Sequence, residues 1–140
     1  MPTITSFIYC EKTETDQNGK LILVQPLLVL TPAFLPGMYS FSIAVGIKGI
    51  PDQMKLRILF ISPDSQDQPL IDTTGINVTK KNVVEDHIID LLPEEEIGIN
   101  FNMDLRNVVL KTEGYYKTVV MINEEVIGEF PIYVKGKDGI

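Results

Sequence analysis

Large apolar residues and small or polar residues alternate along much of the chain. In residues 38–48, every second position from Tyr39 to Ile47 is large and apolar, and the residues between them are mostly small. Residues 54–61 and 97–105 repeat the pattern. A period of two is typical of strands with one face on a core and the other toward water. We predict a β-protein in which residues 38–48 and 54–61 pair as a hairpin.

The longest regular stretch is residues 110–134, which predicts two long strands joined by a turn at residues 123–124. Leu110, Gly114 and Tyr116 have the spacing of a tyrosine corner, in which a Tyr hydroxyl bonds to the backbone a few residues upstream. The second turn residue is Glu, where Gly best tolerates a positive φ, so we expect a loop longer than two residues.

Turn signals divide the rest of the chain into short strands. The sequence DQNG at residues 16–19 separates a strand at 3–10 from one at 21–30. Pro26 cannot donate to a ladder and therefore marks an edge, a bulge or a crossover. Residues 31–37, TPAFLPG, are a connection at which we expect the chain to change sheets. The pattern predicts an all-β, single-domain, immunoglobulin-like antiparallel β-sandwich of seven or eight strands.

Residues 83–92 allow two interpretations. Their apolar positions have the spacing of one helix face, and Asn82 with Glu85 has the pattern of a capping box. Pro93 would end such a helix. We favour a short helix here over a strand, although strand pairing often overrides such signals in β-proteins.

Composition limits the classes of protein that fit this fold. At 140 residues the chain suits one domain, which we place at residues 1–135, with a flexible tail at 136–140. The formal charge of −7 and the scattered basic residues argue against a nucleic-acid partner. The apolar runs are too short for a membrane-spanning helix, and the first residues lack the basic start of a signal peptide.

The single cysteine, Cys10, permits no internal disulfide and is typical of a reducing compartment. We therefore predict a cytoplasmic protein. As a nucleophile Cys10 would need a nearby base, and the only histidine, His87, is far away in sequence. We expect Cys10 to act as a small buried hydrophobe in a strand.

Three segments together resemble a group of small uncharacterised bacterial and prophage-encoded β-sandwich proteins. These are the opening FIYCEKTETDQNGKLILVQP, the middle FSIAVGIKGIPDQMKLRILFISPD and the ending EGYYKTVVMINEEVIGEFPIYV. The resemblance spans most of the chain and implies the same immunoglobulin-like fold and an origin on a mobile element. The resemblance implies no catalytic residues. The chain departs from the group at Glu124, where a glycine is usual, and in the acidic segment 82–96.

One acidic segment offers candidate metal ligands. Asp86, His87 and Asp90 lie close together in sequence and are followed by the carboxylates of residues 94–96. A metal site would need these groups to converge, and one histidine with flexible carboxylates gives a transition metal little support. The alternative is a set of solvated charges beside an apolar stripe, which we favour. We predict no cofactor.

Exposed apolar residues are the remaining functional signal. Leu27, Leu28, Ala33, Phe34 and Leu35 lie around prolines in a connection, and apolar clusters on connections can mark partner sites. The alternative is that Phe34 and Leu35 close one end of the sandwich core.

We therefore predict a non-enzymatic cytoplasmic protein-binding or adaptor module with a protein partner. Phe34 and Leu35 are its candidate contact residues. Self-association through edge strands is a further route to assembly. The alternative function is a metal- or small-ligand-binding protein that uses residues 86–96.

Overall fold

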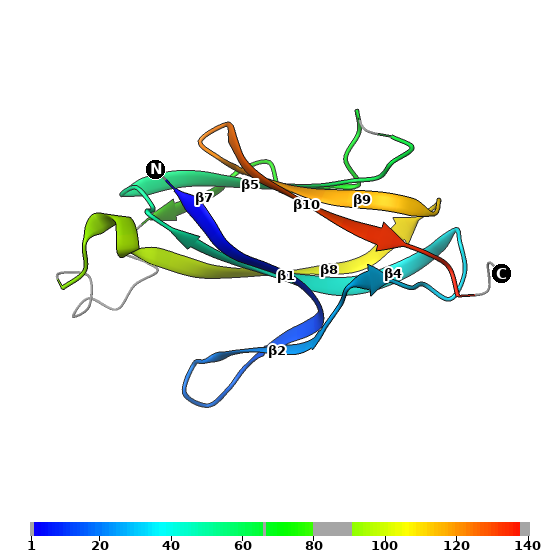
Figure 1. Ribbon diagram of the computed structural model, residues 1–140, viewed down its shortest axis with the longest axis horizontal. Helices are drawn as coiled ribbons and strands as arrows, with labels where there is room; N and C mark the ends of the chain where they lie inside the picture. The colour runs from blue at the N-terminus through cyan, green and yellow to red at the C-terminus, as the bar shows by residue number, and fades with distance from the viewer. Residues whose placement is uncertain (1, 66, 80–90, 138–140) are drawn as a thin grey trace.

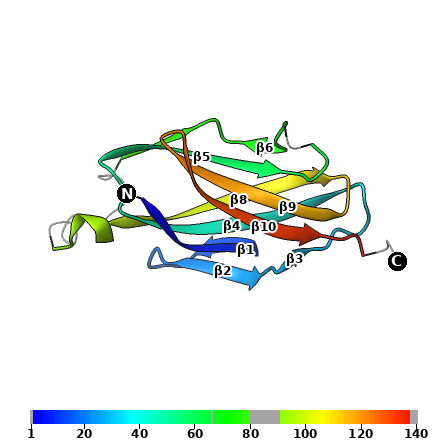
Figure 2. The ribbon, with the colours of Figure 1, turned by 45° about the horizontal axis from the view of Figure 1, so that its top comes forward.

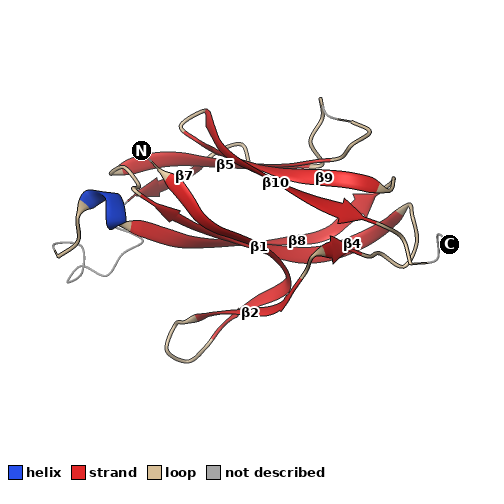
Figure 3. Cartoon of the chain, in the orientation of Figure 1, coloured by secondary structure: helices blue, strands red, loops and turns tan. Residues whose placement is uncertain are grey.

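The chain forms two β-sheets packed face to face, as the computed structural model shows (Figure 1). The structure describes residues 2–65, 67–79 and 91–137. The strands are β1 (Thr3–Thr15), β2 (Leu21–Pro26), β3 (Val29–Leu30), β4 (Gly37–Lys48), β5 (Gln53–Ile61), β6 (Ile71–Asp72), β7 (Ile76–Thr79), β8 (Gly98–Leu110), β9 (Gly114–Ile122) and β10 (Glu125–Val134). A 3-10 turn, η2 (Glu94–Glu96), precedes β8. Strands dominate the fold (Figure 3).

The two sheets differ in size and in how the chain enters them. The four-stranded sheet has the order β2-β1-β4-β8, and the six-stranded sheet has the order β3-β10-β9-β5-β6, with β7 also on β5 (Figure 2). All pairs are antiparallel except β3 with β10. Apart from this one parallel pair, the architecture is the immunoglobulin-like antiparallel sandwich that the sequence predicted.

Aromatic side chains connect the two sheets across the core. Phe41 of β4 lies 5.4 Å from Phe60 of β5 between ring centroids, and Phe60 lies 5.6 Å from Tyr116 of β9. All three side chains are fully buried. Phe41 belongs to the alternating set that the sequence placed on one strand face, and that face does lie on the core.

The predicted tyrosine corner is present at the start of β9. The Tyr116 hydroxyl donates to the Thr112 carbonyl oxygen at 2.8 Å and accepts from the Thr112 amide at 3.3 Å. Gly114 has a φ of +139°, a conformation that favours glycine, and it opens the strand. The corner therefore fixes the path of the chain from β8 in one sheet to β9 in the other.

The described residues form ten strands instead of seven or eight, because residues 21–30 and residues 71–79 each contain two strands. Pro26 ends β2 and the chain then crosses to the other sheet, so the predicted strand 21–30 becomes β2 and β3. Residues 71–79 contain β6 and β7, which share β5 as neighbour. Residues 31–36 carry the chain back from β3 to β4, a change of sheets that the sequence also predicted.

The predicted hairpin of residues 38–48 and 54–61 is wrong. β4 pairs with β1 and β8, whereas β5 lies in the opposite sheet and pairs with β9, β6 and β7. The turn explains the error, because Gly49 with a φ of +72° and Ile50 both donate their amides to the Ile97 carbonyl oxygen. This anchors the loop to the segment before β8 and carries the chain across the core.

The turn between β9 and β10 also differs from the prediction. Ile122 pairs directly with Glu125, so Asn123 and Glu124 form a two-residue turn with φ values of +51° and +69°. Contacts with β5 hold this conformation, since the Asn123 Oδ1 accepts from the Lys55 amide and the Asn123 amide donates to the Lys55 carbonyl, both at 2.9 Å. Glu124 therefore adopts the left-handed region without being glycine.

Two further predictions concern segments at the limits of the described residues. The helix predicted at residues 83–92 lies outside them, except for Leu91 and Leu92, which lie in a turn. At the C-terminal end, the Lys137 amide donates to the Pro32 carbonyl at 2.9 Å. In the part of the chain that the structure describes, no helix is long and apolar enough to cross a membrane.

Candidate functional site

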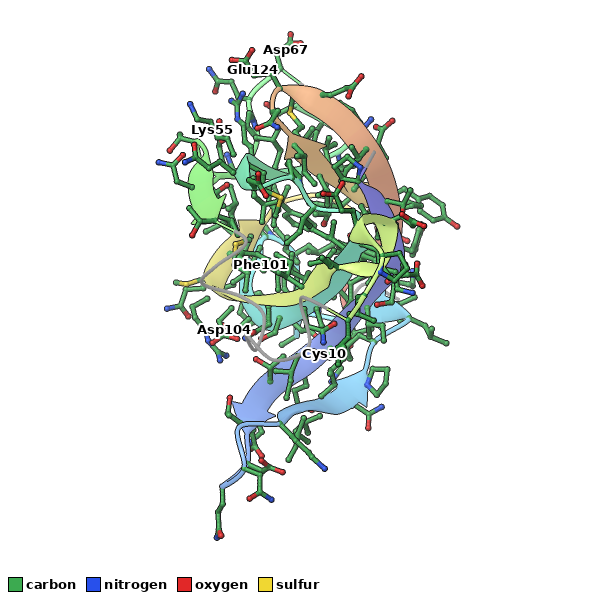
Figure 4. All side chains as sticks on the ribbon, turned by 90° about the vertical axis from the view of Figure 1, so that its left-hand side faces the viewer. Cys10, Lys55, Asp67, Phe101, Asp104 and Glu124 are labelled. Atoms are coloured by element: carbon green, nitrogen blue, oxygen red, sulfur yellow. The ribbon has the colours of Figure 1, made fainter. Side chains whose placement is uncertain are left out.

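A two-stranded hairpin extends beyond the sandwich (Figures 1 and 4). We call residues 11–25 the arm. It consists of the end of β1 and most of β2, paired from Thr15 with Leu21 back to Lys12 with Val24. Of the residues that the structure describes, those of β2 have β1 as their only strand neighbour.

The tip of the arm is a compact turn built on Asp16. Its Oδ1 accepts from the amides of Asn18 and Lys20 at 2.8 Å, and its amide donates to the Lys20 carbonyl at 3.0 Å. Gly19 has a φ of +79° and completes a three-residue loop. The turn that the sequence predicted is therefore confirmed, and it fixes the register of the arm.

β2 begins with four apolar residues, Leu21, Ile22, Leu23 and Val24, and none of its six residues is buried. Alternation directs Ile22 and Val24 to one face of the arm and Leu21 and Leu23 to the other. Both faces thus carry aliphatic side chains with access to water, and Ile22 is 42% exposed. An edge strand of this composition is a ready template for pairing with another chain.

The base of the arm covers part of the outer face of the four-stranded sheet. Cys10 of β1 pairs with Ser42 of β4, and both are fully buried. Ser42 Oγ donates to Asp104 Oδ1 of β8 at 2.5 Å, and Thr13 in the arm accepts from Asn102 Nδ2 at 3.0 Å. The prediction that this face of residues 38–48 lies near water is therefore wrong at its centre.

The buried position of Cys10 agrees with the sequence interpretation of a small buried hydrophobe. Burial, and to a lesser degree the negative charge of Asp104, raise the pKa of the Cys10 thiol. A raised pKa favours the protonated thiol over the thiolate, and the thiolate is the reactive form of cysteine.

An apolar cleft of about 380 Å³ lies at the base of the arm, where β1 meets β10. Its lining consists of Phe7, Ile8, Tyr9, Pro26, Leu27, Leu28, Phe130, Pro131 and Ile132. The Phe7 and Phe130 rings stack with centroids 4.1 Å apart and form its floor between the sheets. Leu28 is 91% exposed, the highest value among the large apolar residues in the described part of the chain.

Tyr9 holds the cleft wall together from inside. Its hydroxyl donates to the Phe130 carbonyl at 2.6 Å and shares a 2.7 Å hydrogen bond with Thr118 Oγ1. Burial raises the pKa of Tyr9 to about 12. The hydroxyl therefore stays protonated over the physiological range, and β1 remains fixed against the edge of β10.

Gln25, the residue that links the arm to the cleft, has a strained backbone conformation. Gln25 has a φ of +56°, which is costly for a residue with a Cβ, and it lies directly before Pro26. The Leu27 amide then donates to the Tyr9 carbonyl at 2.7 Å. The chain is thus turned out of the arm so that Leu28 faces solvent beside the cleft.

The structure separates the two predicted contact residues. Phe34 is 56% exposed, whereas Leu35 is partly buried and packs against the core. Neither lines the cleft. The sequence had pointed to the connection as a whole, and Leu28 is its most exposed large apolar residue.

The predicted metal candidates Asp86, His87 and Asp90 lie outside the described residues. Of the neighbouring carboxylates, residues 94–96 form η2 and are exposed, and Glu96 forms an ion pair with Lys48 at 3.1 Å. Within residues 2–65, 67–79 and 91–137, no three His, Cys, Asp or Glu side chains converge in a geometry that could hold a metal ion.

The sequence profile of a family of unknown function, DUF6941, matches residues 5–135. The chain belongs to this family. The match includes both the arm and the cleft. No curated protein matches the chain significantly.

Solved structures resemble the chain at the level of the fold. The alkylpurine DNA glycosylase AlkC from Pseudomonas fluorescens matches 96% of this chain with a TM-score of 0.52 at 7% identity, and this chain spans 30% of that one. An immunoglobulin-like protein from Pseudomonas aeruginosa matches with a TM-score of 0.47 at 13% identity, over 96% of this chain and 97% of that one. A β-glucosidase from Listeria innocua has a TM-score of 0.45 at 14% identity, over 94% of this chain and 16% of that one. At such identities the likeness concerns the fold alone.

Proposed function

We propose that this protein is a non-enzymatic protein-binding module that binds another polypeptide chain through the arm and the cleft at its base. The observation that carries the proposal is an exposed apolar segment that runs from β2 through Pro26 to Leu28 and has the Lys12–Glu14 ion pair of β1 at its side. No charged residue occurs between Lys20 and Lys48 in the sequence. Apolar surface of this kind, rimmed by polar residues, is typical of protein-interaction sites.

The energetics of Leu28 favour a partner at this site. Its side chain is almost fully in water, and burying a leucine contributes roughly 1.5–3 kcal/mol. The cleft beside it is already formed, because Tyr9 and the Phe7–Phe130 stack hold its walls. A partner would therefore gain contact area without first having to order the site.

An adaptor role requires a second contact surface, and Phe34 supplies a candidate. Its ring is more than half exposed and does not line the cleft. A module with both surfaces could hold two chains at once, which is the adaptor function that we propose for it.

Affinity capture with matched variants tests the proposal. The bait is the tagged full-length protein, compared with Leu28→Asp and with Val126→Asp in an extract of its native cell. Val126 is 52% exposed in β10 and does not line the cleft, so it controls for the added charge. We expect one stoichiometric partner with the unmodified bait and with Val126→Asp, and at least about a tenfold loss with Leu28→Asp.

Equal recovery of the partner with all three baits would contradict the proposed site. Recovery of no chain by any bait, including an untagged copy of the protein itself, would contradict the proposed function. The unfolding midpoint of each bait in urea shows whether the substitution leaves the fold intact.

A further inference from the structure

The free side of β2 presents backbone groups at defined positions. Because the Asp16 amide donates to the Lys20 carbonyl, residues 16 and 20 form a hydrogen-bonded pair at the tip. Hydrogen-bonded and non-hydrogen-bonded pairs alternate along an antiparallel ladder. The amides and carbonyls of Leu21 and Leu23 therefore point away from β1, toward the open side of the arm.

β6 and β8, which also lie at the edges of their sheets, carry features that hinder pairing along the strand, whereas β2 has such a feature only at its last residue, Pro26. Arg57 of β5 and Asp72 of β6 form a bidentate ion pair at 2.9 and 2.7 Å on the outer face of their sheet. β8 carries Asp104 and Arg106, and a register shift with a positive φ at Asn107 interrupts it. Charges, bulges and short strands are the usual protection of a sheet edge. β2 has no charge and no register shift in its ladder with β1.

The charge distribution limits where a second copy of the chain can bind. Each copy of the chain has a formal charge of −7, so two copies can approach closely only where charge is absent. β2 and the segment that follows it carry no charged side chain, since Lys20 and Lys48 are consecutive charged residues, and the two charges that β1 places beside β2, Lys12 and Glu14, pair with each other at 3.1 Å. An uncharged strand is also complementary to itself, because antiparallel pairing across a two-fold axis opposes no like charges within β2.

We propose that two copies of this chain associate through their arms, with β2 paired antiparallel to β2 of the second copy. The inference rests on the proposed function, because it names the chain bound at the same surface. With Leu23 on the two-fold axis, Ile22 of one copy lies opposite Val24 of the other. The tip of each arm then approaches Pro26 and Leu28 at the base of the second arm.

This arrangement explains why β2 directs aliphatic side chains to both faces of the arm, although Lys12 and Glu14 of β1 lie beside Ile22 and Val24. A single two-stranded hairpin is marginally stable in water, whereas two paired arms form a four-stranded ribbon. The ribbon opposes Ile22 and Val24 on one face, and Leu21 and Leu23 gain neighbours on the other. The outward amide and carbonyl of Leu23 become paired with those of the second Leu23.

Analytical ultracentrifugation of the purified full-length protein tests the inference. We expect a dimer whose dissociation constant rises at least about tenfold in Leu23→Pro, because both copies lose an amide donor at the axis. Ile22→Lys, which places charge on the edge, has the same expected effect. Val126→Lys adds the same charge at an exposed site outside the arm and leaves the dissociation constant unchanged.

A disulfide test fixes the register independently. Opposed residues of paired strands come close enough for a disulfide, and the remaining thiol, Cys10, is buried. Under mild oxidation Leu23→Cys should form a covalent dimer, and Val126→Cys should not.

A monomer at all concentrations, or a dimer that neither Leu23→Pro nor Ile22→Lys weakens, would overturn the inference. The proposed function survives that outcome if the capture still depends on Leu28, because a different polypeptide then occupies the surface. If the capture also fails, the proposed function is contradicted together with the inference.

Discussion

Two hairpins of this protein have similar turns but differ in how far their strands are buried. The arm and the β9–β10 hairpin both join consecutive antiparallel strands through a short turn with a positive φ. Five of the nine residues of β9 are buried: Tyr116, Thr118, Val119, Val120 and Ile122. In β2 no residue is buried, although its first four residues are all apolar.

The difference shows that an apolar strand need not belong to a core. β9 lies between β10 and β5, and its inward face packs on the opposite sheet. β2 lies at the end of its sheet, in the hairpin that extends beyond the sandwich, and each of its aliphatic side chains remains at least partly exposed. We infer that the β9–β10 hairpin stabilises the fold and that the arm serves association.

The sharpest test of this comparison uses one substitution in each hairpin. Ile122→Ala in β9 removes a buried side chain and should lower the free energy of unfolding by about 2–5 kcal/mol. Ile22→Ala in β2 removes an exposed one and should change it by less than about 0.5 kcal/mol when the protein is monomeric. Urea unfolding at low protein concentration measures both. Equal losses would mean that the arm is part of the core.

The tyrosine corner gives the next largest effect. Tyr116→Phe leaves the Thr112 carbonyl without its donor inside the fold and should cost about 1–3 kcal/mol of unfolding free energy. Tyr115→Phe is the matched control, since Tyr115 is 67% exposed on the same strand. Urea unfolding should show no measurable loss for the control. A neutral Tyr116→Phe would show that the corner does not anchor β9.

The turn of the buried hairpin offers a gain in stability. Glu124 holds a φ of +69°, which glycine adopts without the steric cost of a Cβ. Glu124→Gly should therefore raise the free energy of unfolding by about 0.5–1 kcal/mol, after the larger chain entropy of glycine is subtracted. Glu125→Gly, one residue later in β10, should lower it. A loss in both variants would show that contacts of Glu124 outweigh its backbone strain.

The smallest expected effect on stability comes from the ion pair between Arg57 of β5 and Asp72 of β6, an edge strand that carries charge where β2 carries none. The hydrogen bonds from Arg57, and next from the Thr74 amide, lower the pKa of Asp72 to about 2. A lowered pKa in the folded state contributes stability above the unfolded value, near pH 4, and that contribution disappears as the pH falls toward 2. Asp72→Asn should thus be slightly less stable than the unmodified protein at pH 7 and equal to it near pH 2. A difference that persists at pH 2 would assign the effect to packing.

Sequence reasoning predicted the fold class because period-two alternation and the Gly114–Tyr116 corner are local signals. It failed where the outcome depends on the opposite sheet. The alternation in β4 and β5 is the same for a hairpin as for two strands in different sheets, and only the anchoring of Gly49 and Ile50 to Ile97 distinguishes them. The conformation of Glu124 likewise depends on a contact between Asn123 and a distant strand.

The candidate site could be predicted only in part. The prolines of the connection after β2 indicated an exposed apolar segment, which Leu28 and Phe34 confirm. The arm was less visible, because LILV looks the same in a core strand as in an exposed one. The usable signal was the absence of charge from Leu21 to Ile47 combined with Pro26, which stops the strand before it can enter the second sheet.

Amide hydrogen exchange of the purified protein at low and high concentration tests the central claim most directly. The account predicts that β9 and β10 exchange slowly at both concentrations, because the core protects them. The amides of Leu21 and Leu23 should exchange rapidly in the monomer and become protected at high concentration, when a second copy pairs with β2. Rapid exchange of these two amides at every concentration, or protection already present in the monomer, would contradict it.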